Sequence, residues 1–185
     1  MCAACASVPE RHTVTGTLPF AALHPNSGAS FDCDAIAGHV SHSSFGVSSA
    51  SGFVAGAVYF HAIEVPDKWI PTISIFLEGP KPNEDVAGAR LGRFPKFPDS
   101  IAFHLVFRTP MGTLSNESYE DRRVKLGSDI QFELKWTGRQ AAMRFLPDGA
   151  WANIPMSFDA SRLSLGCSSS EAIFHDVVIK TPEPP

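Results

Sequence analysis

Two histidines lie inside apolar segments that could hold their imidazole rings in fixed positions. His61 lies in the segment Val58–Ile63, two residues after Tyr59, and His104 is the central residue of Ile101–Phe107. An imidazole titrates near neutral pH, so it can exchange hydrogen bonds with a ligand or act as a general base. If both segments are strands of one sheet, the two histidines can face a common ligand. The alternative is that each is a buried core histidine whose hydrogen bonds are satisfied.

An aromatic and a cationic side chain extend this candidate site. Trp69 lies between Pro66 and Pro71, in a polar segment that predicts an exposed loop. Its indole offers a flat face on which a ring-shaped ligand can stack, or it anchors the loop at a sheet edge. Arg144 is expected to point outward from a strand. The candidate binding residues are therefore Tyr59, His61, Trp69, His104 and Arg144.

The acidic residues give weaker indications of chemistry. Asp32 and Asp34 share one strand face, where two carboxylates can bind calcium or exchange protons. No further oxygen ligands follow at a recognisable spacing, so a solvated strand start is favoured, and neither a metal nor a cofactor is expected. The denser group of Glu117, Glu120 and Asp121 is interpreted as a solvated loop beside its own arginines.

The four cysteines lie at the N-terminus and near both ends of the central segment. Cys33 and Cys167 either form a disulfide in an oxidising compartment or are two buried thiols, and both alternatives stay open. The segment Ala3–Pro9 resembles the processing site of bacterial lipoproteins, in which small residues precede a lipidated cysteine. This resemblance implies a lipid anchor at Cys5 and a location in the cell envelope or periplasm. The alternatives are an idle terminus and a cytoplasmic protein.

The composition restricts the class of protein. Of 185 residues, 44% are hydrophobic and 18% are charged, which is typical of a folded chain rather than a disordered one. The net charge of −4 argues against nucleic acid as a partner. No apolar run approaches the roughly 20 residues of a membrane-spanning helix. The 15 prolines are spread along the chain and leave few windows for helices.

The apolar pattern predicts strands and turns. Apolar and polar residues alternate strictly in Ile130–Trp136, as in a strand with one buried face. Residues 79–98 have little periodicity and predict a long loop of the kind that forms lids or binding sites. Ser168–Ser170 predicts a hairpin loop. The other predicted strands are residues 13–20, 31–47, 52–65, 72–78, 100–108, 141–146, 151–156, 163–167 and 172–179. We expect one domain over residues 12–180, a tail or tether over 1–11 and a stub over 181–185.

Four segments together resemble the C-terminal half of concanavalin A-like lectin/glucanase domains. They are Ile130–Trp136, Asp148-Gly149, Leu163–Cys167 and Phe174–Val177. The resemblance implies an all-β fold, a two-sheet antiparallel β-sandwich of jelly-roll type, with one curved sheet that often binds glycans. The carboxylate order of the glucanases, Glu-x-Asp-x-x-Glu, is not found.

The expected function is therefore a non-catalytic carbohydrate-binding module of a bacterial envelope protein, with a glycan as its ligand. One alternative is a glycan-active hydrolase or lyase that uses His61 or His104 as a base. Another is a structural lipoprotein whose sandwich docks a protein partner. The oligomeric state stays open.

Overall fold

The computed structural model describes residues 13–15, 28–48, 50–62, 70–81, 85–93, 100–108, 114–125, 127–147 and 149–180. The predicted tail at 1–11 and stub at 181–185 lie outside this part. The described residues form eleven strands, and their pairings are antiparallel except that of β1 with β2. The strands are β1 (Thr13–Thr15), β2 (Ala29–Gly46), β3 (Ser51–Ala62), β4 (Thr72–Glu78), β5 (Val86–Gly92), β6 (Ser100–Arg108), β7 (Leu114–Lys125), β8 (Ile130–Thr137), β9 (Gln140–Phe145), β10 (Ala152–Pro155) and β11 (Arg162–Lys180). In this part of the chain, no helix has the length and apolar character that crossing a membrane requires.

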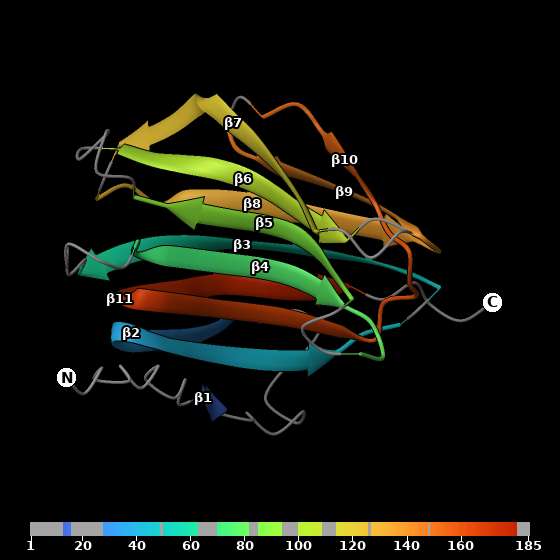
Figure 1. The fold of residues 1–185 in the computed structure, drawn as a ribbon, viewed down its shortest axis with the longest axis horizontal. Coiled ribbons are helices and arrows are strands. Elements are labelled where there is room, and N and C mark those ends of the chain that lie inside the picture. The colour runs from blue at the N-terminus through green and yellow to red at the C-terminus, as the bar shows by residue number, and fades with distance from the viewer. Residues whose placement is uncertain are drawn as a thin grey trace, which may run out of the picture.

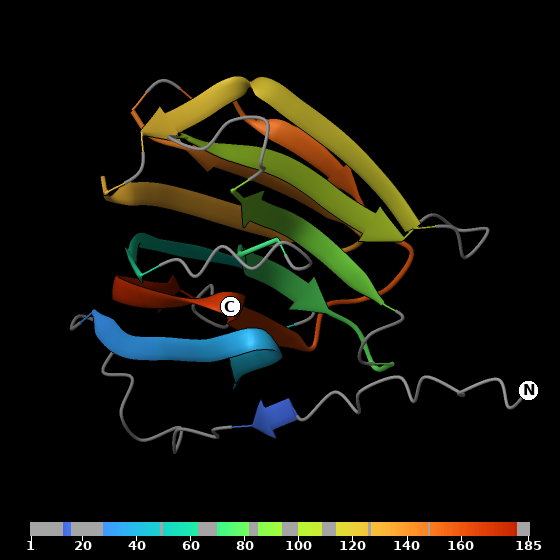
Figure 2. The same cartoon turned by 60° about the vertical axis from the view of Figure 1, so that its left-hand side comes forward.

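The sheet is folded into two layers, and β11 belongs to both. The strand order is β10-β9-β8-β3-β11-β4-β5-β6-β7, and β2 pairs with β11. Residues 162–168 of β11 pair with β4, whereas residues 171–180 pair with β3. We call β4 to β7 with residues 162–168 the front layer, and β3, β8, β9 and β10 with residues 171–180 the back layer (Figure 1). Figure 2 shows the green and yellow strands of the front layer passing before the orange strands of the back layer.

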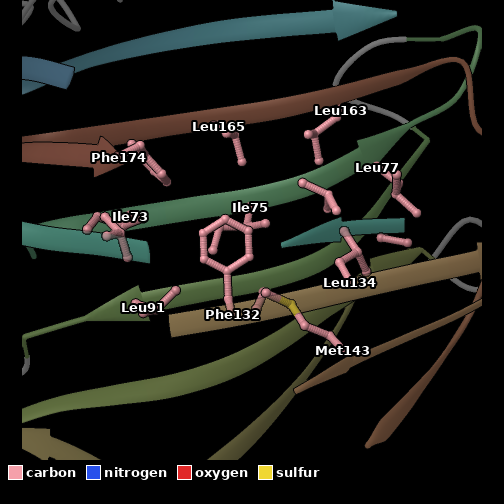
Figure 3. Packing of buried hydrophobic residues seen from close by; sticks show 14 of the residues in the cluster. Ile73, Ile75, Leu77, Leu91, Phe132, Leu134, Met143, Leu163, Leu165 and Phe174 are labelled. Atoms are coloured by element: carbon pink, nitrogen blue, oxygen red, sulfur yellow. The ribbon is translucent and has the colours of Figure 1, made fainter. Parts of the chain in front are cut away.

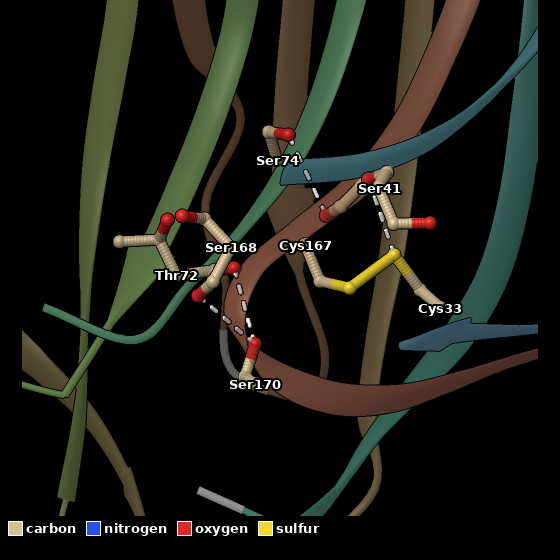
Figure 4. Close-up of a disulfide and its surroundings, with 8 residues drawn as sticks. Cys33, Ser41, Thr72, Ser74, Cys167, Ser168 and Ser170 are labelled. Carbon is tan, nitrogen blue, oxygen red and sulfur yellow. Dashed lines mark hydrogen bonds between the residues drawn. A yellow bond between two sulfur atoms is a disulfide. The ribbon is translucent and has the colours of Figure 1, made fainter. Parts of the chain in front are cut away.

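The strand β11 bends from one layer into the other at Ser169. This residue is fully buried and has a φ of 53°. Its Oγ accepts a hydrogen bond of 3.0 Å from the backbone N–H of Gly38 in β2, whose φ is 81°. Both strands therefore bend at the same place. A disulfide between Cys33 and Cys167 joins them beside this bend, with the Cα atoms 5.9 Å apart (Figure 4). Of the two alternatives that the sequence left open, the structure contains the disulfide.

The predicted hairpin loop at Ser168–Ser170 is wrong, because one continuous strand runs through it. Serine usually favours turns because its hydroxyl competes for backbone hydrogen bonds. Here the hydroxyls are used inside the sheet. The Oγ of Ser170 lies 3.4 Å from the carbonyl oxygen of Thr72 and 3.3 Å from that of Ser168 (Figure 4). The polar run therefore bends the strand without ending it.

Two further strands lie where loops were predicted. The strand β5 interrupts the predicted loop over residues 79–98, and β7 contains the acidic run that was interpreted as a solvated loop. The sequence of β5, Val-Ala-Gly-Ala-Arg-Leu-Gly, has little β propensity. It is a strand because β4 and β6 pair with it on both sides. Tertiary pairing therefore overrides local preference here.

The hydrophobic core fills the space between the layers. In β8 the side chains alternate between buried and accessible as predicted, with Phe132, Leu134 and Trp136 almost completely buried. Figure 3 shows Phe132 and Leu134 together with side chains from β4, β5, β9 and β11. Phe103 of β6 stacks on Phe145 of β9, with ring centroids 4.3 Å apart. The core therefore joins the two layers directly, and the prediction of an all-β antiparallel fold is confirmed.

Candidate functional site

A polar row crosses the face of the front layer that points away from the core. His104 of β6 pairs with Arg90 of β5, and Arg90 pairs with Ser74 of β4. Ser74 then pairs with Gly166 of β11, which pairs with His42 of β2. Directly opposite residues on one face of a sheet lie about 5 Å apart, so these residues form a continuous strip. In β4, β5, β6 and β11 the neighbours of these residues along the strand belong to the core, so this part of the strip faces outward.

The adjoining row consists mainly of small residues. Gly88 has no space for a side chain, because an added Cβ would overlap the carbonyl oxygen of Ile75. The guanidinium of Arg90 lies 5.9 Å from the ring centroid of Phe76, which fixes the arginine over an apolar surface. Val106 and Ser164 of this adjoining row are buried. Arg90, which belongs to the first row, is exposed. The accessible part of the strip therefore centres on Arg90.

The described part of this face carries several arginines, although the protein has a net charge of −4. A third row adds Arg108 of β6, Glu78 of β4 and Arg162 of β11. The Nε of Arg162 lies 3.5 Å from the Oε2 of Glu78, so this pair is locally neutral. Arg90 and Arg108 are further arginines on the described part of this face. We call the three rows together the polar strip. Its guanidinium and hydroxyl groups can bind hydroxyl and carboxylate groups of a ligand, whereas both ring nitrogens of His104 are buried.

The structure does not bring the described members of the predicted site together. Tyr59 and the backbone of His61 lie in β3 of the back layer, whereas His104 lies in β6 of the front layer. The structure does not describe the side chain of His61, and Trp69 lies outside the described residues. Among the predicted site residues that the structure describes, only His104 belongs to the polar strip, and a role in ligand binding stays a prediction for all five.

Arg144 belongs to a cluster on the back layer. Its Nε lies 2.6 Å from the Oε2 of Glu133, its strand partner in β8. Its guanidinium lies 4.7 Å from the ring centroid of Trp151, and the Nζ of Lys135 lies 4.1 Å from the same centroid. These contacts link β8 and β9 to the segment that enters β10. Arg144 therefore has a structural explanation that needs no ligand.

The acidic pair Asp32 and Asp34 lies beside a pocket of about 270 Å³ at the back of the bend. Glu171 of β11 pairs with Asp34 and also lines this pocket. All three side chains are exposed. Within the described ranges, no group of three or more His, Cys, Asp or Glu side chains is placed to hold a metal ion.

His175 is a charged site that the sequence patterns did not single out. Its Nδ1 lies 2.9 Å from the Oδ2 of Asp176, and its Nε2 lies 3.2 Å from the Oδ1 of Asp129. The hydrogen bond with Asp176 raises the pKa of His175, and Asp129 raises it further, against a lowering by burial. The adjacent His-Asp pair was visible in the sequence, but the approach of Asp129 depends on the pairing of distant strands.

The fold and the polar strip define an all-β jelly-roll protein with a polar outer face. No protein-family model matches the chain, and no curated protein matches its sequence. Solved structures do share the fold. An alginate lyase from Alteromonas sp. 272 superposes with a TM-score of 0.55 at 8% identity, over 85% of this chain and 82% of that one. A carbohydrate-binding module, CBM66 from Bacillus subtilis, gives 0.52 at 11% identity, over 81% and 86%. The polysaccharide lyase family 18 protein aly-SJ02 gives 0.53 at 6% identity, over 71% and 72%.

These comparisons confirm the concanavalin-like jelly-roll fold that the sequence predicted. At such low identities the likeness concerns the fold alone. The protein therefore shares its fold with carbohydrate-binding modules and polysaccharide lyases.

Proposed function

We propose that this protein is a carbohydrate-binding module that holds an anionic glycan on the polar strip. The observation that carries the proposal is the register that places Ser74, Arg90 and His104 side by side across three strands. A row of this kind spans about 10 Å, which is enough for two sugar residues. The hydroxyl of Ser74 would bind a sugar hydroxyl, and the guanidinium of Arg90 would bind a carboxylate.

The charge distribution supports an acidic rather than a neutral glycan. Glu78 is the only carboxylate in the described rows of the strip, and it is already paired with Arg162. Arg90 is exposed on the strip and can form a charge-assisted hydrogen bond with a carboxylate, which a neutral sugar lacks. Binding to a polyanion should weaken as salt screens these charges, whereas binding to a neutral sugar should not.

The proposal is tested by isothermal titration with alginate, polygalacturonate and a neutral β-glucan of similar length. We expect binding to the two polyuronates, with a roughly tenfold or greater loss in Arg90→Ala because a charge-assisted hydrogen bond contributes about 1.5–3 kcal/mol. Arg139→Ala is the matched control, since this exposed arginine pairs with Asp159 away from the strip. Equal affinities of the two variants, or binding to the neutral glucan alone, would contradict the proposal.

The second candidate function is a polysaccharide lyase on the same strip, favoured by the pairing of His104 with Arg90. In such a reaction Arg90 would neutralise the uronate carboxylate. His104, whose ring nitrogens are buried in this structure, would have to become accessible before it could remove the proton at C5. The C4–O bond would then break, the departing oxygen would take a proton from water, and a double bond between C4 and C5 would remain. The unsaturated product absorbs in the ultraviolet, so turnover of alginate can be followed directly. Turnover that His104→Ala abolishes would replace the binding-module proposal by this one.

We also propose that the protein works in an oxidising compartment such as the periplasm or cell envelope. The Cys33–Cys167 disulfide supports this location, because disulfides persist in such compartments. The lipid anchor predicted at Cys5 lies outside the described residues. Alkylation of protein from its native source should modify neither Cys33 nor Cys167 until a reductant is added, and alkylation without reductant would contradict the proposed compartment.

A further inference from the structure

His175 bridges two separate elements of the back layer. Its Nδ1 contacts Asp176, which follows it in β11, and its Nε2 contacts Asp129, which precedes β8. The side chain of His175 is 29% exposed, and that of Asp129 is 54% exposed. The contacts are therefore open enough to respond to solvent pH, yet they join segments far apart in the chain.

The geometry requires a particular protonation state. Both ring nitrogens face carboxylate oxygens, and an ionised carboxylate can only accept hydrogen bonds. A neutral imidazole has a single N–H, so it can satisfy one of the two contacts. Only the imidazolium form donates to both Asp129 and Asp176. The raised pKa of His175 agrees with this geometry.

The bridge lies at an irregular point of the sheet. The pairing of β11 with β2 shifts between Phe174 and Val177, and its pairing with β3 shifts between His175 and Val178. Asp176 has a φ of 54°, in the left-handed region that is costly for most residues. The ladder is thus interrupted on both sides of β11 at the same point, and backbone pairing alone holds this point weakly.

The paired residues nearest to His175 are uncharged, so the charged groups that act on it are the two carboxylates. Its partner in β3 is Ala57, and the nearest paired residues of β2 are Phe31 and Ala29. Asp129 and Asp176 are the charged groups that raise its pKa.

We propose that protonated His175 is a pH-dependent clamp that ties the start of β8 to the bulge in β11. At low pH the clamp holds both segments together. When His175 loses its proton, one contact loses its donor and the attraction to both carboxylates disappears. The bulge and the residues before β8 then separate more easily.

The sign of the effect on stability follows from the raised pKa. The clamp contributes fully below the ordinary histidine pKa of about 6.5, because His175 is then protonated in both the folded and the unfolded chain. Its contribution is lost as the pH rises through the raised pKa of the folded protein. The melting temperature should therefore fall as the pH rises from about 6 to about 8. Part of this fall should require the contacts of the clamp.

The test is an NMR titration of the His175 ring protons, assigned with His175→Gln, in the full chain and two variants. Asp129→Asn removes one carboxylate, and Asp159→Asn is the matched control because Asp159 is similarly exposed and pairs with Arg139 instead. We expect a His175 pKa above about 6.5 that falls in Asp129→Asn and is unchanged in Asp159→Asn. The difference in melting temperature between pH 6 and pH 8 should be smaller in Asp129→Asn than in the unmodified full chain or the control variant. A His175 pKa at or below 6.5, or identical behaviour of the two Asn variants, would overturn the clamp.

Discussion

At the scale of single residues, Trp136 combines burial with one specific hydrogen bond. It is 2% exposed, and its indole Nε1–H donates to the carbonyl oxygen of Ser48 at 2.8 Å. The ring lies over Gly52, its strand partner in β3, where an added Cβ would overlap it. Glycine and tryptophan therefore fit each other across β3 and β8.

Trp136→Phe should lower the free energy of unfolding by about 1–3 kcal/mol, because the Ser48 carbonyl loses its donor while an aromatic ring remains in the core. The measurement is urea denaturation followed by circular dichroism. Trp151→Phe is the matched control, since Trp151 is partly exposed and a phenyl ring can still contact Lys135 and Arg144. We expect that control to change stability by roughly 0.5 kcal/mol or less. Equal losses in the two variants would show that the hydrogen bond to Ser48 has no special role.

The residue scale also shows what the sequence can predict of the site. The position of His104 in a buried strand follows from the apolar residues around it, and the structure confirms that strand. Its neighbour Arg90 was not predicted, because it lies in β5, which the sequence pattern presented as a loop. Register between strands depends on distant pairing, so no local pattern could place Arg90 beside His104.

At the scale of elements, the bend shared by β2 and β11 is held by the disulfide. Cys33 and Cys167 are separated by 134 residues, so their bond closes a long loop in the unfolded chain. Closing such a loop reduces the entropy of the unfolded state and stabilises the folded one.

Replacing both cysteines, Cys33→Ser with Cys167→Ser, should lower the free energy of unfolding by about 2–5 kcal/mol. Urea denaturation with and without a reductant provides the measurement. The reductant should bring the unmodified protein close to the double variant and leave the double variant unchanged. If the reductant has no effect on the unmodified protein, the bond is absent or contributes nothing.

The hydroxyl of Ser169 is the second feature that holds the bend. Ser169→Ala removes the acceptor for the Gly38 N–H, while serine and alanine both carry a Cβ at this positive φ. We expect a loss of about 1–3 kcal/mol, because Ser169 is completely buried and water cannot replace the acceptor. Ser157→Ala, at a partly exposed serine, should cost less in the same denaturation assay. A larger loss in Ser157→Ala would contradict this explanation of the bend.

Strands with one solvated face were predictable, and strands of unusual composition were not. Alternation identified β8 because its polar positions meet water. The strand β7 carries an acidic and basic run that is more typical of a loop, and β11 contains Ser168–Ser170. In both, the pairing partners decide the conformation. The bend could not be predicted for the same reason. Ser169 becomes a bend residue only where Gly38 of another strand lies beside it.

At the scale of the whole molecule, the two layers share one core and should unfold together. Phe103 of the front layer stacks on Phe145 of the back layer, and β11 runs through both. Small proteins with a single core usually unfold in one cooperative transition. The fluorescence of Trp136 and Trp151 reports on the back layer. It can therefore show whether a substitution in the front layer also destabilises the back layer.

Phe103→Ala should lower the free energy of unfolding by about 3–5 kcal/mol, because it leaves a cavity between the layers. In a Trp69→Phe background, tryptophan fluorescence reports only Trp136 and Trp151, whereas far-ultraviolet circular dichroism reports the strands of both layers. Both probes should shift to the same lower urea midpoint, although the substitution is in the front layer. If Phe103→Ala does not fold, Phe103→Leu provides the same comparison with a smaller shift. A fluorescence midpoint that stays in place while the dichroism midpoint falls would show that the layers unfold independently.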